Sequence, residues 1–252
     1  MSKFLLSNDD GVDAGGLAAA VAVMREFGEV LVVAPRWEQS GMSSAITKSV
    51  PLLLHRITAD TYALQGTPSD CVKFAIYELL AGKTPQLLVS GINHGANLGQ
   101  DTIYSGTVAA AIEGALHGIP AIAVSIVGLP PYKFATAAAA LRHVVVNYAS
   151  HIKVGKVLNI NVPNVDIDQI KGYRSATLGV RSYERRFHRA SNPRSLPYFW
   201  LGWYRSDKLS DGNAGSDCSL VDDGYVAMTM LNPSFSDDED TQALQKLLDS
   251  SP

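Results

Sequence analysis

Two adjacent carboxylates near the start of the chain are the residues best suited to chemistry. Asp9 and Asp10 follow residues 1–7, which predict a short buried strand, with only Asn8 between. Ligands of an open parallel sheet bind outside the carboxyl ends of its strands, so both aspartates are expected at such an edge. Because neighbouring carboxylates repel one another, a bound cation such as Mg²⁺ or Mn²⁺ keeps both ionised most easily. The alternative is a solvated turn, which Asn, Asp and Gly also favour.

A loop rich in hydroxyl groups offers a further oxygen ligand. Residues 29–34 are a β-branched run that predicts the second strand, and the loop of residues 36–47 after it carries Ser40. Both loops leave strands of the same parallel sheet, so Ser40 is expected at the same edge as Asp9 and Asp10. A simple connector is the alternative, because Ser and Gly are common in connecting loops.

A loop of glycines and asparagines follows the strand predicted at residues 86–90. Its small residues let the backbone approach a ligand closely. Asn93 and Asn97 carry side-chain carbonyls that bind hard metal ions and amides that donate to phosphate oxygens. Both asparagines are therefore candidate ligands of a metal ion or a phosphate group.

The start of the next helix predicts an anion site. Ser105 fits the N-cap position before the alanine-rich helix of residues 109–116. The backbone N–H groups of Gly106, Thr107 and Val108 are then free to bind an anion at the positive end of the helix dipole. A plain Ser cap on a core helix is the alternative. The neighbouring Gly/Asn loop favours a cradle for a phosphate group.

The elements that must position these residues alternate between strands and helices. Residues 16–27 predict a helix between the first two strands, which makes a βαβ unit with a right-handed crossover. The dinucleotide fingerprint Gly-x-Gly-x-x-Gly is absent after the first strand. Further elements are expected as a hairpin at residues 51–65, a capping box from Thr67 to Asp70, strands at residues 121–125 and 157–162, and a helix at residues 132–150. The expected fold is α/β and Rossmann-like, a mostly parallel sheet with helices on both faces.

The last third of the chain differs in character. We expect a single domain over residues 1–252, with a core at residues 1–175 and an extended C-terminal β arm at residues 176–252. Residues 181–194 hold five arginines and predict a solvated segment. Residues 198–204 hold five aromatic side chains, which suggest packing on another subunit or back onto the core. The rest of the arm is expected as a loop at residues 211–223, a strand at residues 224–230 and a short terminal helix at residues 241–248.

Composition limits the partners and the compartment. A net charge of -3 gives no general attraction to nucleic acid or to an anionic membrane surface. No apolar stretch reaches membrane-spanning length, and the N-terminus lacks the apolar run of a secretory signal. Cys71 and Cys218 are too few for a disulfide scaffold, which suits a reducing cytosol. We expect a cytoplasmic protein that binds no membrane.

Six motifs occur in a fixed order along the first half of the chain. They are Leu5-Leu6-Ser7-Asn8-Asp9-Asp10-Gly11-Val12, Val33-Ala34-Pro35, Ser40-Gly41-x-Ser43, Gly66-Thr67-Pro68-x-Asp70-Cys71-Val72, Val89-Ser90-Gly91-Ile92-Asn93-x-Gly95-x-Asn97-Leu98-Gly99 and Tyr104-Ser105-Gly106-Thr107-Val108. Together they resemble the SurE (survival protein E) family of metal-dependent 5′-nucleotidases. One departure is Gly15, where the family often has Pro, and it affects the stiffness of a turn rather than chemistry.

The resemblance implies a function for most of the candidate residues. It implies a divalent ion held by Asp9, Asp10, Ser40 and Asn93. It also implies a phosphate group near Asn97, Ser105, Gly106 and Thr107. Oligomers that exchange extended segments between subunits are a further implication, so a homodimer or homotetramer is expected.

The predicted function is hydrolysis of the phosphate monoester of nucleoside 5′-monophosphates, with a range that could extend to 3′-nucleotides and polyphosphate. Asp9 and Asp10 would be the catalytic residues, with one Mg²⁺ or Mn²⁺ ion per subunit and a metal-activated water as the attacking group. An aspartyl-phosphate phosphatase is one alternative, although such enzymes usually show Asp-x-Asp after the first strand. A non-catalytic nucleotide or RNA-binding module that uses the arginine-rich segment is the other.

Overall fold

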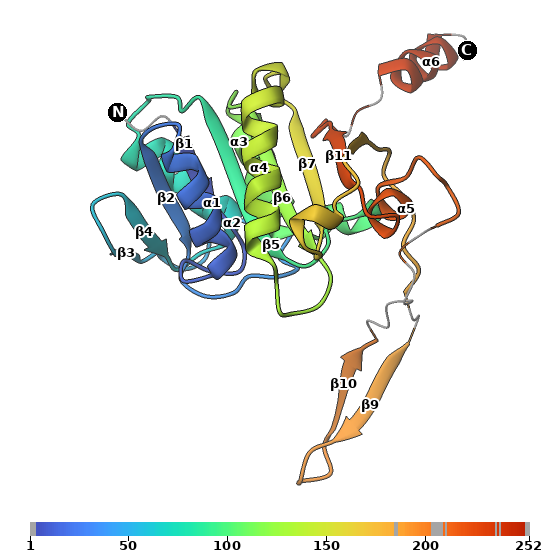
Figure 1. Ribbon diagram of the computed structural model, residues 1–252. Coiled ribbons are helices and arrows are strands. Elements are labelled where there is room, and N and C mark those ends of the chain that lie inside the picture. Colours follow the sequence, from blue (N-terminus) through green and yellow to red (C-terminus); the bar gives the residue numbers. More distant parts are fainter. Residues whose placement is uncertain are drawn as a thin grey trace.

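The computed structural model describes residues 4–183, 186–202, 209, 211–234, 236 and 238–249. Figure 1 shows one large sheet with helices on both faces, a hairpin that projects from it and a terminal helix. The strands of the sheet are β1 (Phe4–Ser7), β2 (Val30–Pro35), β3 (Leu54–Arg56), β4 (Thr61–Leu64), β5 (Leu87–His94), β6 (Ala121–Val127), β7 (Val157–Pro163), β8 (Tyr173–Ser175) and β11 (Val226–Leu231). The α-helices are α1 (Gly15–Arg25), α2 (Pro68–Phe74), α3 (Gly106–Leu116), α4 (Phe134–Tyr148), α5 (Asp217–Asp222) and α6 (Asp238–Asp249).

The order of the strands places a ligand site beside β1. The sheet runs β3-β4-β2-β1-β5-β6-β7-β11-β8, and β1 pairs in parallel with β2 on one side and with β5 on the other. The chain thus changes direction across the sheet between β1 and β5, which is the topological switch point where open α/β sheets bind ligands. Antiparallel pairs occur only between β3 and β4 and between β11 and β7 among the described strands of this sheet. The predicted Rossmann-like α/β fold with a mostly parallel sheet is confirmed.

Two apolar layers cover the two faces of the sheet. Leu6 packs in the cluster beneath α1 and α4, and its neighbour Leu5 packs in the cluster beneath α2 and α3. This division follows because successive side chains of a strand point to opposite faces. On the first face, α1 lies directly against β5, since a Cβ added at Gly16 would lie 1.9 Å from the carbonyl oxygen of Ile92.

Local signals in the sequence set the start of α2. The Thr67 Oγ1 atom accepts a hydrogen bond from the backbone N–H of Asp70 at 3.1 Å, and Asp70 Oδ2 accepts one from the backbone N–H of Thr67 at 2.9 Å. Pro68 occupies the first helical position, where a missing N–H costs nothing. The predicted capping box is confirmed.

The C-terminal region contributes to the main sheet as well as to the projecting hairpin. Strand β11 pairs with β7 and β8, so this part of residues 176–252 lies within the sheet. The loop expected at residues 211–223 is wrong in part, because these residues contain α5. Ser216 caps that helix by accepting a hydrogen bond from the backbone N–H of Ser219 at 3.1 Å, a signal that the density of Gly and Asp residues obscured.

The hairpin consists of β9 (Phe187–Ser191) and β10 (Pro197–Leu201), which pair with each other in a sheet of their own. It projects away from the body of the molecule (Figure 1). Trp200 is 69% exposed and Phe199 is 58% exposed. Two members of the aromatic segment 198–204, Trp203 and Tyr204, lie outside the described residues.

The arginine-rich segment 181–194 divides into two environments. Arg189 and Arg194 are exposed, as expected for a solvated segment. Arg181 is instead buried, with 7% of its surface exposed, so the expectation of a solvated side chain is wrong there. Its burial follows from a carboxylate partner on a distant loop, Asp101. No helix in the described ranges is long and apolar enough to cross a membrane.

Candidate active site

The residues selected from the sequence meet at the carboxyl edge of β1 and β5. A cavity of about 160 Å³ opens there. Its walls include five of the eight candidate residues, namely Asp9, Ser40, Asn93, Asn97 and Ser105. The other three, Asp10, Gly106 and Thr107, adjoin this cavity through contacts with His94 or Asp9. Residues up to 98 positions apart in the chain therefore converge on one site.

Asp9 is held by the first turn of α3. Its surface is 3% exposed, and Oδ1 accepts a hydrogen bond from the Thr107 hydroxyl. The close approach needs Gly106, where an added Cβ would lie 2.8 Å from the Cβ of Asp9. The pKa of Asp9 is raised from 3.8 to about 6, mainly by burial, while the hydrogen bond from the Thr107 side chain opposes the shift and the negative charge of Asp10 adds to it.

Asp10 faces the end of β5. Its Oδ2 accepts a hydrogen bond from the backbone N–H of His94 at 3.1 Å, and its Oδ1 lies 3.5 Å from His94 Nδ1. Burial raises the pKa of Asp10 from 3.8 to about 6, and the charge of Glu38 adds to the effect. Burial also lowers the pKa of His94, which favours a neutral imidazole beside this carboxylate.

Ser40 faces the cavity from the loop after β2, and Asn93 faces it from the end of β5, which extends into the segment expected as a loop. The Ser40 hydroxyl donates a hydrogen bond to Glu38 Oε1 at 2.8 Å. The Asn93 side-chain amide donates to the carbonyl oxygen of Gly95 at 2.9 Å, so its nitrogen is already engaged. The hydroxyl oxygen of Ser40 and the side-chain carbonyl of Asn93 are the atoms that suit a cation.

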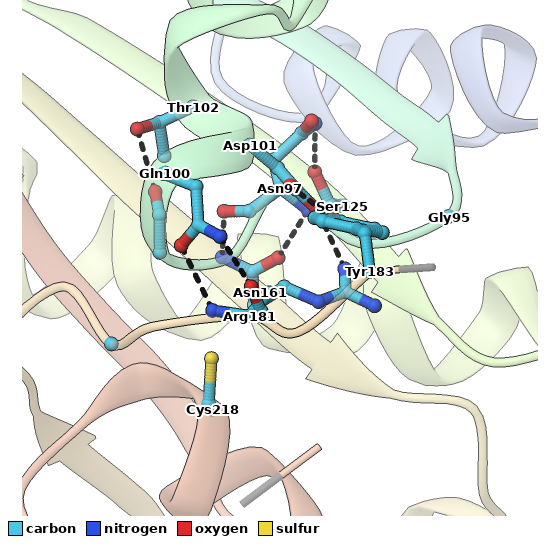
Figure 2. Close-up of polar contacts among 12 residues, drawn as sticks. Gly95, Asn97, Gln100, Asp101, Thr102, Ser125, Asn161, Arg181, Tyr183 and Cys218 are labelled. Carbon is cyan, nitrogen blue, oxygen red and sulfur yellow. Dashed lines mark hydrogen bonds and ion pairs between the residues drawn. The ribbon is translucent and has the colours of Figure 1, made fainter. Parts of the chain in front are cut away.

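Asn97 belongs to a buried amide network, part of which Figure 2 shows. Its side-chain amide donates to Ser125 Oγ at 2.8 Å, and its backbone N–H donates to Asn161 Oδ1 at 2.9 Å. The side-chain amides of Asn159 and Asn161 in β7 each donate to its carbonyl oxygen at 2.9 Å. These four bonds fix the loop at a wall of the cavity.

Ser105 is the N-cap of α3, as the sequence predicts. Its Oγ accepts a hydrogen bond from the backbone N–H of Val108 at 3.0 Å, so the expectation that this N–H is free for an anion is wrong. Thr107 differs from the expectation in one respect, because its hydroxyl donates to Asp9 and so lies on the carboxylate side of the site. The anion cradle and the acidic turn are thus joined by a hydrogen bond.

Three lining residues with polar side chains were not selected from the sequence: His94, Asp101 and Tyr104. His94 is the last residue of β5, and its Nε2 is buried without a hydrogen-bond partner in the described part of the structure. Asp101 lies in the 3₁₀ helix Gly99–Ile103, and Tyr104 is the residue directly after this helix. The only signal for Asp101 is its place between Asn97 and Ser105, whereas Tyr104 begins the motif of residues 104–108.

Comparison with known protein families shows which family the chain belongs to. The model of the family described as Survival protein SurE matches residues 4–185. The chain belongs to the SurE family. The match covers the acidic turn, the Gly/Asn loop, the start of α3 and Arg181.

Curated SurE relatives align over nearly the whole chain. The 5′-nucleotidase SurE of Vibrio vulnificus is 40% identical over 246 residues, which cover 98% of this chain and 95% of the relative. The 5′-nucleotidase SurE of Vibrio cholerae is 39% identical and covers 98% of this chain and 97% of the relative. That of Aeromonas hydrophila is 42% identical and covers 91% of each chain.

A solved SurE structure has the same fold. The crystal structure of the SurE protein from Aquifex aeolicus superposes with a TM-score of 0.85 at 34% sequence identity. The superposition covers 97% of this chain and 98% of that chain. The SurE likeness therefore includes the C-terminal region as well as the α/β core.

Proposed function

We propose that this SurE-family chain is a 5′-nucleotidase, a phosphomonoesterase that hydrolyses nucleoside 5′-monophosphates. The full-length relatives named 5′-nucleotidase SurE support this activity. The observation that carries it is the buried pair Asp9 and Asp10, set beside the capped start of α3 at the switch point of the sheet. An acidic pair and an anion site in one cavity suit phosphate-ester hydrolysis assisted by a metal ion.

The donor set fits one hard divalent ion. Asp9, Asp10, Ser40 and Asn93 present oxygen atoms, which Mg²⁺ and Mn²⁺ prefer. Burial holds the pKa of both carboxyls at about 6, so a cation between them would offset the cost of two ionised groups. Such an ion supplies Lewis-acid activation of the phosphoryl group and of water when it is bound.

The chain's own residues bind and orient the substrate around this centre. The side chains of Asn97 and Ser105 bind the phosphate oxygens from the cavity wall. Gly106 lets the first turn of α3 approach closely, so the positive end of the helix dipole faces the phosphate group. Thr107 orients Asp9 through its hydrogen bond and holds that carboxylate in its ionised form.

We also propose that the active protein is a homodimer or homotetramer in the cytoplasm. Trp200 and Phe199 point to opposite faces of the projecting hairpin and are both mostly exposed, which supports assembly through that hairpin, because both of its faces offer aromatic surface to another subunit. Cys71 and Cys218 are both free thiols, which suits the reducing cytosol.

Phosphate release from a nucleotide panel tests the activity. We expect release from AMP and GMP with Mg²⁺ or Mn²⁺, loss of release after chelation with EDTA, and recovery when the ion is restored. Parallel assays with 3′-AMP and polyphosphate measure how far the range extends. A chain that binds RNA tightly and releases no phosphate from any nucleotide would contradict the proposal.

A further inference from the structure

The segments at both ends of the projecting hairpin are anchored to the loop that carries Asn97 and Ser105. Before the hairpin, residues 179–183 lie against the 3₁₀ helix Gly99–Ile103. After it, Asp217 accepts hydrogen bonds from the backbone N–H groups of Gly99 at 2.9 Å and Gly179 at 2.8 Å. Hydrogen bonds therefore join the C-terminal region to the wall of the active-site cavity, and Figure 2 shows those made by Gln100 and Asp101.

Asp101 is the centre of these contacts. Arg181 Nη1 lies 2.6 Å from Asp101 Oδ2, and the Tyr183 hydroxyl donates to Asp101 Oδ1. The side chain of Arg181 is 5% exposed and that of Asp101 is 14% exposed. The guanidinium carbon of Arg181 lies 5.5 Å from the centre of the Tyr183 ring, so the cation also faces an aromatic surface.

The backbone reinforces this contact. Gln100 Nε2 donates to the carbonyl oxygen of Arg181 at 2.5 Å, and the backbone N–H of Arg181 donates to Gln100 Oε1 at 2.8 Å. The carbonyl oxygen of Asp101 accepts hydrogen bonds from the backbone N–H groups of Tyr104 at 3.0 Å and Ser105 at 3.1 Å. The position of Asp101 thus affects the position of the helix cap that follows.

The charges of Arg181 and Asp101 affect how the cavity binds an anionic substrate. Asp101 lines the same cavity as Asp9, whereas Arg181 lies behind it and is not a lining residue. A phosphate monoester that enters this cavity is an anion, and an unpaired carboxylate in the wall would repel it. A buried guanidinium paired with that carboxylate removes the repulsion, and the low local dielectric makes the removal larger than it would be in water.

We propose that Arg181 is a positioning residue that neutralises Asp101 and holds the 3₁₀ helix Gly99–Ile103, so that the cavity accepts the phosphate group of the substrate. The proposal rests on the 5′-nucleotidase activity proposed above. It gives Arg181, near the start of the C-terminal region, a role in the affinity for substrate. Neither residue reacts, so the effect falls on binding of the substrate before chemistry.

A double-mutant cycle on the full-length protein tests this pair. Arg181→Gln should raise KM for AMP about tenfold while kcat changes about twofold or less, because the unpaired Asp101 charge opposes binding of the anion. Arg181→Lys keeps the charge and should recover most of the lost affinity. Asp101→Asn combined with Arg181→Gln removes both charges and should bring KM back to within about threefold of the wild type. Arg25→Gln is the matched control, because Arg25 forms an exposed pair with Asp60 at 2.8 Å outside the cavity, and KM should not change.

The outcomes separate the pair from the proposed activity. Unchanged KM in Arg181→Gln, or a double variant whose KM is as high as that of Arg181→Gln, overturns the role of the pair. If Arg181→Gln does not fold, Asp101→Asn alone decides, since its KM should stay equal or fall and a clear rise overturns the proposal. A wild type without phosphatase activity contradicts the proposed function instead. The pair is then tested by calorimetric titration of inorganic phosphate with Mg²⁺, where Arg181→Gln should bind more weakly than wild type and equal binding overturns it.

Discussion

The Thr107 hydroxyl, in the first turn of α3, donates a hydrogen bond to the Oδ1 atom of Asp9 at the end of β1. This bond joins the turn proposed to hold a metal ion to the helix start proposed to bind phosphate. Partners that orient a ligating carboxylate contribute to metal affinity although they do not touch the metal. Thr107 should therefore influence both halves of the site.

Replacement of Thr107 tests this link. Thr107→Val keeps the shape of the side chain and removes the donor, so we expect metal affinity to fall about tenfold or more, as for other hydrogen-bonded partners of ligands. The pKa of Asp9 should rise as well, because the lost bond stabilised the ionised form. Calorimetric titration of Mn²⁺ measures the affinity. Unaltered Mn²⁺ binding would show that Thr107 serves only the phosphate.

Ser105 offers the contrasting case. Ser105→Ala removes the acceptor for the Val108 N–H, so the free energy of unfolding should fall by ~1 kcal/mol, the usual cost of a lost N-cap. KM for AMP should rise while Mn²⁺ affinity stays unchanged. Ser105→Asn, which restores a capping side chain, is the control for stability. A loss of Mn²⁺ binding in Ser105→Ala would place this serine on the metal side.

Asp10 carries the strongest expectation for activity. Asp10→Asn should leave the fold intact and reduce kcat/KM by about 100-fold or more, since a proposed metal ligand loses its charge. Circular dichroism checks the fold and titration checks the ion. Near-normal turnover with a bound ion would remove Asp10 from the site.

The raised pKa of Asp10 predicts that the stability of the protein depends on pH, and Asp10→Asn also tests this prediction. In the folded state, burial raises the pKa of Asp10 from 3.8 to about 6, so folding favours the protonated form. The stability associated with that proton is present below pH 3.8 and is lost as the pH rises through 6. In EDTA, Asp10→Asn should thus exceed the wild type in free energy of unfolding by ~2 kcal/mol at pH 7.5, with a smaller gap at pH 5. Urea unfolding at both values measures the gap, and one that does not change with pH would contradict the assignment.

The exposed aromatic residues of the hairpin predict its role in assembly. Trp200→Ser together with Phe199→Ser removes two large apolar side chains that are mostly exposed in the subunit. Sedimentation at several concentrations should show a shift toward the monomer with Mn²⁺ affinity retained. Leu247→Ser on α6, another exposed apolar side chain, is the comparison. A wild type that is monomeric at micromolar concentration would refute assembly through the hairpin.

Local chemistry explains what could be predicted from the sequence. Thr67 and Ser105 act through hydrogen bonds to residues three positions away, so their capping roles can be recognised without tertiary structure. Strand periodicity and the βαβ order then place Asp9 and Asn93 at one edge of the sheet. These relations are short in sequence or follow from general rules of chain topology.

The features that the sequence did not reveal depend on distant partners. Arg181 is buried because it forms an ion pair with Asp101, which is 80 positions away in the chain. No residue near either of them in the sequence indicates this pair. The helix α5 stayed unrecognised because the Gly and Asp residues around its Ser216 cap predict a loop, and the bond from Gly99 to its buried Asp217 spans 118 positions. Thr107 belongs to both classes, since its place in the helix is local and its bond to Asp9 is not.

The contact at Gly16 has a consequence for how the protein can change in sequence. A side chain there would collide with the carbonyl of Ile92, one residue before Asn93, so α1 and the metal loop could not both keep their positions. A saturation library at position 16 should yield glycine alone among active clones. A library at Leu116, which is exposed on α3, should tolerate many residues. The spacing between α1 and β5 therefore makes a residue without chemistry of its own as intolerant of replacement as a ligand.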